Sequence, residues 1–133
     1  MNKFKCSVSK IENIESLNLV YFSFKSTTIS MVSLDLSENI TTNRKVILSL
    51  KPTNITLAKN FEGLVSSSNK LLGKIVFIEQ GKLLSSVVCE VFDTQIESII
   101  TTNSLKQMKL AVDDEITLLF KASDISILEI VDV

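Results

Sequence analysis

An internal repeat constrains the fold of this chain more than any other feature of its sequence. A shift of about 67 positions aligns an ordered series of similar residues, namely Asn2-Lys3 with Asn69-Lys70, Ile11-Glu12 with Ile78-Glu79, Leu17 with Leu84, Val20 with Val87, Thr27 with Thr94, Ile29 with Ile96 and Ser37 with Ser104. Further on, a shift of about 70 positions aligns Leu48, Lys51 and Ile55 with Leu118, Lys121 and Ile125. The chain is therefore interpreted as two copies of one small module. We predict a first, degenerate domain over residues 1–60 and a second over residues 66–133, joined by a linker at 59–65.

Each copy contains short runs of β-forming residues separated by polar turns. The expected strands are 4–11, 17–24, 29–36 and 45–50 in the first copy, and 74–78, 83–92, 96–101, 115–120 and 125–130 in the second. Glu79-Gln80-Gly81 offers a turn in which Gly81 is free to take a positive φ. Ser104 followed by Gln107 fits a capping box, which predicts a short helix before the fourth strand. Five short strands with a helical turn predict an all-β fold of two tandem OB-like barrels, each with one short helix.

Composition narrows the possible functions. The chain has 133 residues, of which 45% are hydrophobic, so a folded core is expected. Its formal net charge of −1 gives no basic footprint for DNA or RNA. With 6% aromatic residues and no tryptophan, it also lacks a stacking surface for single strands.

The sequence gives no sign of export, membrane insertion or metal ligation. Residues 1–6 carry basic side chains without an apolar segment behind them, and no apolar run approaches the roughly 20 residues that span a bilayer. Cys6 and Cys89 lack the spacing of metal ligands or of a disulfide framework. We expect a cytoplasmic protein with reduced thiols, no directly coordinated metal and no cofactor.

Three segments of the second copy follow one another in a recognisable order. They are a Ser/Asn-rich lead with Leu-x-Gly-x-Ile-x-x-Ile-Glu-x-Gly at 66–81, Ile-Thr-x-x-Ser-Leu at 100–105, and an aliphatic run that ends in Lys-Ala-Ser-Asp-Ile at 116–125. This pattern resembles the molybdate-binding Mop/TOBE domains, and the whole chain resembles a tandem, or di-Mop, protein. The resemblance implies a cytoplasmic protein that holds molybdate or tungstate. It also implies a homo-oligomer, typically a trimer of tandem chains, with oxyanions bound where domains meet.

The resemblance also implies which residues contact the oxyanion. Those of the second copy are Ser66, Ser68, Asn69, Thr101, Ser104, Lys121 and Ala122, and those of the first are Asn2, Ser37 and Lys51. The match departs from the family pattern at two positions, since Ser68 stands where an arginine is common and Leu34 replaces the threonine in the first copy. A site built from the first copy alone is therefore not expected, and sites that combine residues of both copies stay open as an alternative.

The chemistry of these residues suits a tetrahedral dianion, which accepts hydrogen bonds and donates none. Ser104 at a helix start would add backbone N–H groups, and Thr101 would deliver its hydroxyl to the same end. Lys121 would supply positive charge. The chain has no histidine, so binding is expected to change little across neutral pH.

Every one of these residues also has an ordinary structural explanation. Ser104 can be a plain N-cap, Thr101 a strand residue and Lys121 a surface lysine. The serine run 66–68 can be linker, and Asn69 can close a turn. Their joint occurrence in the family order favours the functional interpretation.

The main hypothesis is an oxyanion-binding protein for storage, buffering or homeostasis of molybdate or tungstate. One alternative is an anion-sensing module that regulates a transport ATPase or a transcription factor in trans, and another is an OB-like nucleic-acid binder. An enzyme is not expected, because the chain has no histidine and no carboxylate pair in a recognisable context. Ser67-Ser68-Asn69-Lys70 matches Ser-x-x-Lys, but no partner motif of an acyl-transfer enzyme follows.

Overall fold

Strands make up most of the computed structural model, which describes residues 1–131. The strands are β1 (Asn2–Ile14), β2 (Leu17–Phe24), β3 (Thr27–Ser33), β4 (Lys45–Leu50), β5 (Thr56–Ala58), β6 (Asn69–Gln80), β7 (Leu84–Val91), β8 (Thr94–Thr101), β9 (Glu115–Phe120) and β10 (Ile125–Ile130). A 3-10 helix η1 (Pro52–Asn54) follows β4, and an α-helix α1 (Thr102–Gln107) follows β8. The all-β prediction is confirmed.

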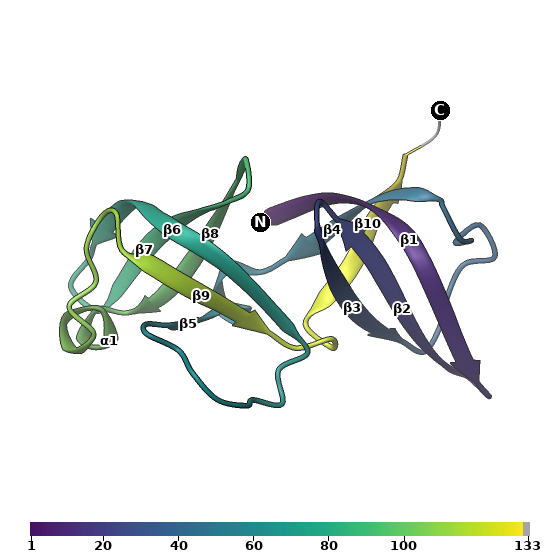
Figure 1. Ribbon diagram of the computed structural model, residues 1–133, viewed down its shortest axis with the longest axis horizontal. Helices are drawn as coiled ribbons and strands as arrows, with labels where there is room; N and C mark the ends of the chain where they lie inside the picture. The colour runs from purple at the N-terminus through teal and green to yellow at the C-terminus, as the bar shows by residue number, and fades with distance from the viewer. Residues whose placement is uncertain (132–133) are drawn as a thin grey trace.

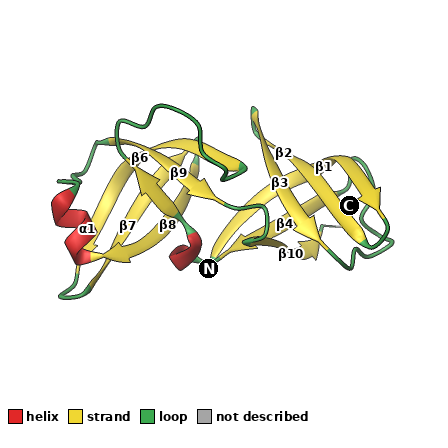
Figure 2. Ribbon diagram, turned by 90° about the horizontal axis from the view of Figure 1, so that it is seen from below, coloured by secondary structure: helices red, strands yellow, loops and turns green. Residues whose placement is uncertain are grey.

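The two five-stranded sheets exchange one strand each. The first sheet has the order β10-β4-β1-β2-β3 and the second the order β5-β9-β6-β7-β8. In Figure 1, β10, from the end of the chain, lies beside β4 in the first half, while β5 pairs with β9 in the second. The predicted domain boundary at residues 60–66 stays a prediction about the sequence repeat. In space, each sheet is completed by a strand from across that boundary (Figure 2).

The sequence repeat is reproduced in the irregularities of the strands. The β1–β2 ladder changes register between Val8 and Lys10, and the β6–β7 ladder between Ile75 and Phe77. These bulges lie about 67 positions apart, at equivalent places, and each one bends a long strand so that its sheet can curl. The two halves are therefore copies in fine geometry as well as in strand order.

The short helical elements differ between the halves. α1 lies between β8 and β9, where the sequence predicts a helix, whereas residues 34–44 of the first half form turns. The helical element of the first half, η1, instead follows β4 and begins at Pro52, a residue favoured at the first position of a helix. Among residues 1–131, no helix combines the length and the apolar character that crossing a bilayer requires.

The turn at Gly81 does not use the positive φ that the sequence allows there. Among the described glycines, Gly63 has a positive φ (101°) and Gly81 does not. Gly81 is required for close approach, because a Cβ at this position would lie 2.4 Å from the Leu84 carbonyl oxygen, to which the Gly81 N–H donates a hydrogen bond of 3.1 Å. The turn therefore needs glycine for space and not for a left-handed backbone.

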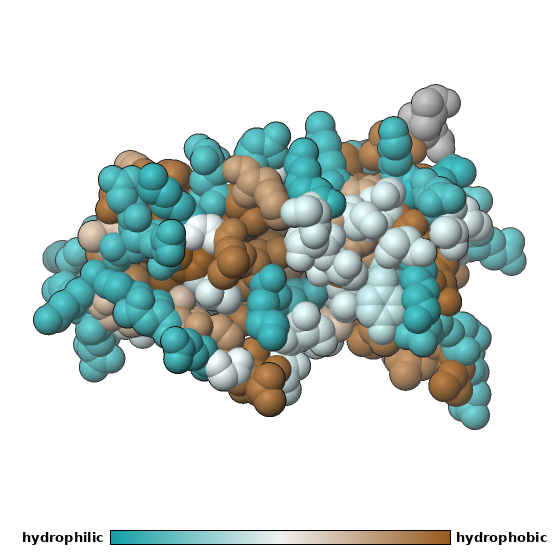
Figure 3. All heavy atoms as spheres, viewed as in Figure 1, coloured by the Kyte–Doolittle hydropathy of each residue, from teal (hydrophilic) through white to brown (hydrophobic). Residues whose placement is uncertain are grey.

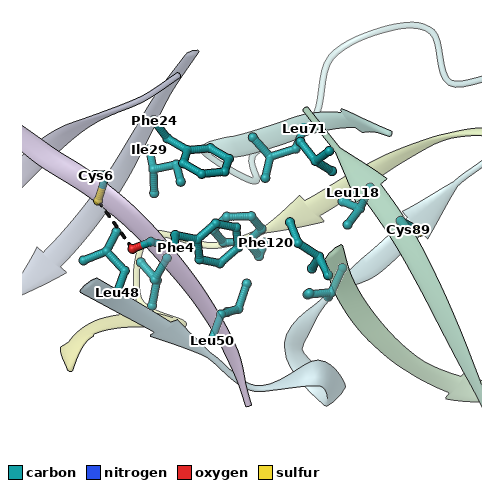
Figure 4. Packing of buried hydrophobic residues seen from close by; sticks show 14 of the residues in the cluster. Phe4, Cys6, Phe24, Ile29, Leu48, Leu50, Leu71, Cys89, Leu118 and Phe120 are labelled. Atoms are coloured by element: carbon teal, nitrogen blue, oxygen red, sulfur yellow. Dashed lines mark hydrogen bonds between the residues drawn. The ribbon is translucent and has the colours of Figure 1, made fainter. Parts of the chain in front are cut away.

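A chain of aromatic rings joins the two halves through one continuous core. Phe4 of β1 packs edge-on against Phe24 of β2 at 5.2 Å and stacks with Phe120 of β9 at 6.0 Å between ring centroids. Phe24 in turn meets Phe92, in the β7–β8 turn, at 5.8 Å. Figure 4 shows Phe4, Phe24 and Phe120 between the two sheets, next to Leu71 and Leu50. Such contacts bury large apolar side chains where the halves meet and stabilise them as one unit.

Gly73 provides a test of the packing inside β6. A Cβ at this position would lie 2.9 Å from Val91 Cγ2, 3.0 Å from the Glu90 carbonyl oxygen and 3.2 Å from Leu118 Cδ1. We expect Gly73→Val to lower the free energy of unfolding by about 1–3 kcal/mol through overpacking. Chemical denaturation followed by circular dichroism measures this, and an unchanged midpoint would contradict it.

Candidate functional site

Two asparagine side chains tie each half of the protein to the other. The Ser30 N–H, on β3, donates to Asn69 Oδ1 at 2.8 Å, and Asn69 Nδ2 donates to the Ser30 carbonyl at 3.0 Å. At the equivalent place, the Glu97 N–H of β8 donates to Asn2 Oδ1 at 2.8 Å, and Asn2 Nδ2 donates to the Glu97 carbonyl at 2.7 Å. Each side-chain amide thus pairs with the backbone of an edge strand as another strand would. The result is two equivalent junctions between the halves.

The junction at β3 gathers the largest group of predicted site residues. Asn69 pairs with Phe120 in the β6–β9 ladder, which places the start of β6 beside Lys121 and Ala122. The Ala122 carbonyl accepts a hydrogen bond of 2.9 Å from the Val32 N–H, so the β9–β10 turn also lies against β3. The predicted residues at this junction, or next to it in the chain, are Ser68, Asn69, Lys121 and Ala122, while Ser66 lies three residues before Asn69 in the exposed loop.

The hydrogen-bond donors at this junction differ in their exposure and in whether they already bond within the protein. Asn69 is 1% exposed, and both ends of its amide are bonded to Ser30. Lys121 is exposed, and its backbone N–H donates to the Asp124 carboxylate at 3.1 Å. Ser66 and Ser68 are exposed, and within residues 1–131 no hydrogen bond engages their hydroxyls. The lysine and the two hydroxyls can therefore reach a ligand, whereas Asn69 holds the surrounding backbone in place.

The junction at β8 holds the predicted residues Asn2 and Lys51. Asn2 pairs with Leu50 at the end of β4, which brings it next to Lys51. Lys51 is exposed, and its carbonyl accepts the Asn54 N–H at 3.0 Å as η1 begins. Met1 stands at the position equivalent to Ser68, so this junction has a thioether side chain where the junction at β3 has a hydroxyl.

Thr101 and Ser104 lie apart from both asparagines, at the end of β8 and the start of α1. The prediction that Ser104 caps the helix is wrong: Thr101 is the N-cap, and its Oγ1 accepts the Ser104 N–H at 3.1 Å. Thr101 also donates its hydroxyl hydrogen to Ser104 Oγ at 2.9 Å. Thr101 has the extended backbone (φ −68°, ψ 145°) that a capping residue needs, whereas Ser104 lies within the helix. These hydroxyls are thus bonded to each other, and in residues 1–131 no hydrogen bond connects them to Lys121.

Ser37 occupies the corresponding region of the first half. It is exposed, its Oγ accepts the Asn39 N–H at 3.3 Å and its carbonyl accepts the Ile40 N–H at 3.0 Å. These bonds order a turn in the segment that lacks a counterpart of α1. In this single chain, the predicted site residues therefore fall into three regions: the junction at β3, the junction at β8, and the hydroxyls that follow β3 and β8.

Sequence reasoning missed the partners of the two asparagines. Ser30 and Glu97 contribute backbone groups only, so no side-chain motif marks them. The repeat shift was the available signal, since it aligns Ser30 with Glu97 as it aligns Asn2 with Asn69. Lys59 was also missed. Its Nζ donates to the Met108 and Lys109 carbonyls at 3.2 and 3.1 Å and fixes the end of α1.

Comparison with known proteins finds a family likeness in the second half of the chain. Residues 66–127 match the family model of the TOBE domain. This segment is therefore similar to TOBE domains. The matched range contains the junction residues Ser66, Ser68 and Lys121, together with Thr101 and Ser104.

Solved structures extend the likeness to the whole chain. A structure of ModG, described as a cytoplasmic molybdate-binding protein and solved with molybdate bound, superimposes with a TM-score of 0.87 at 20% identity, over 95% of this chain and 94% of that one. This confirms the fold of two tandem OB-like barrels. A molybdate-binding protein from Sporomusa ovata is 27% identical over 50% of this chain and 100% of its own, with a TM-score of 0.49. Both of these proteins are described as molybdate-binding proteins. No match is found among curated protein sequences.

The junction at β3 can be tested through Asn69. We expect Asn69→Leu to lower the free energy of unfolding by about 2–4 kcal/mol, because it leaves the partly buried N–H and C=O of Ser30 without partners. Thermal unfolding measures the change. Asn103→Leu, at an exposed position, serves as the control. Equal stability of the two variants would show that the Asn69 amide does not hold the halves together.

Proposed function

We propose that this chain binds molybdate or tungstate in the cytoplasm and serves in their storage, buffering or homeostasis. The proposal rests on the exposed donors in and next to the β3 junction: Lys121, which follows Phe120 opposite Asn69, and the hydroxyls of Ser66 and Ser68, which precede Asn69 in the chain. The TOBE match over residues 66–127 and the tandem architecture shared with ModG support the same ligand class.

The chemistry of the junction explains how such an anion would be held. Molybdate and tungstate are tetrahedral dianions whose oxygens accept hydrogen bonds, so their binding site needs hydroxyls, N–H groups and a cation. Lys121 supplies the cation, and the serines supply hydroxyls on a segment that Asn69 fixes to β3. Ser68 takes the place of the family arginine, so Lys121 carries a larger share of the charge compensation.

An oxyanion bound at an interface between two copies of the chain could also contact Thr101 and Ser104. We propose a homo-oligomer, a trimer of tandem chains, in which Thr101 and Ser104 of one copy complete the donor set of another. Exposed leucines support an assembly: Leu17 and Leu84, at equivalent positions of the repeat, are 48% and 59% exposed, and Leu83 is 83% exposed. Figure 3 shows an apolar patch toward the middle of one face, with polar residues around it.

Native mass spectrometry of anion-stripped protein, with and without molybdate or tungstate, tests the proposal. We expect a defined oligomer that gains a fixed number of anions, while phosphate at the same concentration adds none. A defined oligomer that ignores both anions would overturn the proposed ligand. Isothermal calorimetry on the same preparation provides the affinity.

A further inference from the structure

A carboxylate lies in the same turn as Lys121. The Asp124 carboxylate accepts a hydrogen bond of 3.1 Å from the Lys121 N–H, and the Asp124 N–H donates to the Lys121 carbonyl at 3.0 Å. This turn connects β9 to β10 and begins directly after Phe120, the partner of Asn69 in the β6–β9 ladder. Asp124 is half-buried. A negative charge therefore lies three residues from the lysine that is proposed to hold the oxyanion.

The charge of Asp124 is not neutralised by a neighbouring cation. Within residues 1–131, no basic side chain forms an ion pair with Asp124, and this includes the Lys121 ammonium group. Asp114 shows a different arrangement in an equivalent turn. It accepts the Ala111 N–H at 2.9 Å and donates to the Ala111 carbonyl at 3.1 Å, but its carboxylate is also paired with Lys59 Nζ at 3.2 Å. Of these two turns, the one at the β3 junction keeps an uncompensated carboxylate.

The first half of the protein forms the corresponding turn without this charge. The repeat shift aligns Asn54 with Asp124, as it aligns Lys51 with Lys121. The Asn54 N–H donates to the Lys51 carbonyl at 3.0 Å, the same backbone bond that closes the turn at Lys121. No side chain caps the Lys51 N–H there. The turn can therefore form without a carboxylate, so the charge of Asp124 is not needed for the backbone conformation.

Asp124 opposes the binding of a dianion at Lys121 in two ways. Its carboxylate repels the anion, and this repulsion grows as bound ligand and protein displace water from between the charges. It also occupies the Lys121 N–H, which is a potential donor to the anion. A carboxylate only accepts hydrogen bonds, so Asp124 cannot offer the oxyanion a donor in exchange. Both effects lower the affinity of the junction for molybdate or tungstate.

We propose that Asp124 weakens oxyanion binding at the β3 junction and thereby makes this a site that exchanges its anion readily. The inference rests on the proposed function and favours buffering over storage, because at a similar association rate weaker binding means faster release. Asp124 acts through its charge and through the Lys121 N–H, so it sets the affinity without being a ligand of the anion.

Asp124→Asn gives the decisive test, since it removes the charge and keeps an oxygen that can accept the Lys121 N–H. We expect calorimetry on the anion-stripped full chain to show at least about tenfold tighter molybdate binding than in the unaltered chain at low salt. At about 1 M salt, where the Debye length is about 3 Å, the difference should become smaller. Equal or weaker binding by Asp124→Asn at low salt would overturn the proposal.

Asp124→Ala distinguishes this role from a purely structural one. The variant removes the charge and the acceptor together, which leaves the Lys121 N–H free for the anion. We expect it to bind molybdate more tightly than the unaltered chain, although the lost turn hydrogen bond lowers its melting temperature. If Asp124 served only to hold the turn, Asp124→Ala would bind more weakly and Asp124→Asn would bind as the unaltered chain does. That pattern would contradict the proposal.

The matched control is Glu79→Gln, which makes the same change in net charge at an exposed position near the other end of β6. At about 3.3 Å per residue, Glu79 lies roughly 33 Å along the strand from Asn69. Its affinity should stay within about twofold of the unaltered chain, because distant exposed charges are screened. Tightening equal to that of Asp124→Asn would mean that net charge, and not Asp124, sets the affinity.

The same titrations separate this inference from the proposed ligand. Molybdate binding by the unaltered chain without a response to Asp124→Asn overturns the role of Asp124 and leaves the ligand standing. Absence of molybdate and tungstate binding in the unaltered chain and in both Asp124 variants overturns the ligand and the inference together.

Discussion

Lys121→Ala is expected to weaken molybdate binding by about 10- to 100-fold, equivalent to about 1.5–3 kcal/mol for a hydrogen bond to a charged group. The ammonium group is exposed at the β3 junction, beside a backbone turn that the Asp124 carboxylate already holds through the Lys121 N–H. Removal of the side chain leaves that backbone bond intact. The loss should therefore appear in affinity and not in stability, and calorimetry with a thermal melt separates the two.

The control for this prediction is Lys106→Ala, which removes the same charge from the last turn of α1. Its affinity should stay within about twofold of the unaltered protein, because exposed charges at a distance are screened by salt. An equal loss in both variants would mean that bulk charge, and not a site at Lys121, attracts the anion.

Phe4→Ala is expected to lower the free energy of unfolding by about 3–5 kcal/mol, the range for truncation of a fully buried phenylalanine. Phe4 is 0% exposed and contacts Phe24 of its own sheet and Phe120 of the other half. Its loss opens a cavity where the halves join. Urea denaturation measures the change, with Lys3→Ala, at an exposed position of the same strand, expected within about 0.5 kcal/mol of the unaltered protein.

The two thiols provide an independent readout of that variant. Burial raises the pKa of Cys6 to about 12 and that of Cys89 to about 11, so both are protonated and inert in the folded protein at neutral pH. Labelling then requires opening of the structure. Phe4→Ala should label faster at both cysteines if it loosens the shared core, whereas faster labelling of Cys6 alone would indicate that the halves open separately.

The sequence predicted the strands well but could not predict their partners. Apolar residues indicate a strand over Ile125–Ile130, of which Ile125 is buried and Ile127 and Ile130 are half-buried, and such a sequence is the same whether the strand joins its own sheet or the other one. The choice of partner depends on where the β9–β10 turn leads the chain, and that turn is fixed by contacts with β3 that are remote in sequence. The pattern of apolar residues therefore could not predict that the two sheets exchange strands.

The sequence indicated which residues could form the candidate site, but it did not predict which of their hydrogen-bonding groups are already engaged. Asn69 was named for its motif position, yet its amide is engaged by the Ser30 backbone, a partner that carries no side-chain signal. Thr101 and Ser104 lie at one helix end as expected, but the N-cap is Thr101 and not Ser104. Residue type indicates which groups can donate hydrogen bonds, whereas the fold decides which of those donors are already satisfied.

The exchange of β5 and β10 has a consequence for chain integrity. The loop between β5 and β6 is largely exposed and connects the two halves of the chain. The strand before it, β5, belongs to the second sheet, and β10, which comes after it, belongs to the first. A protease that nicked this loop would produce two pieces, each supplying one strand of the other's sheet. Dissociation of the two fragments would break the backbone hydrogen bonds of β10 with β4 and of β5 with β9. We therefore expect the cleaved protein to stay folded as a noncovalent complex of two fragments, held together by strand pairing.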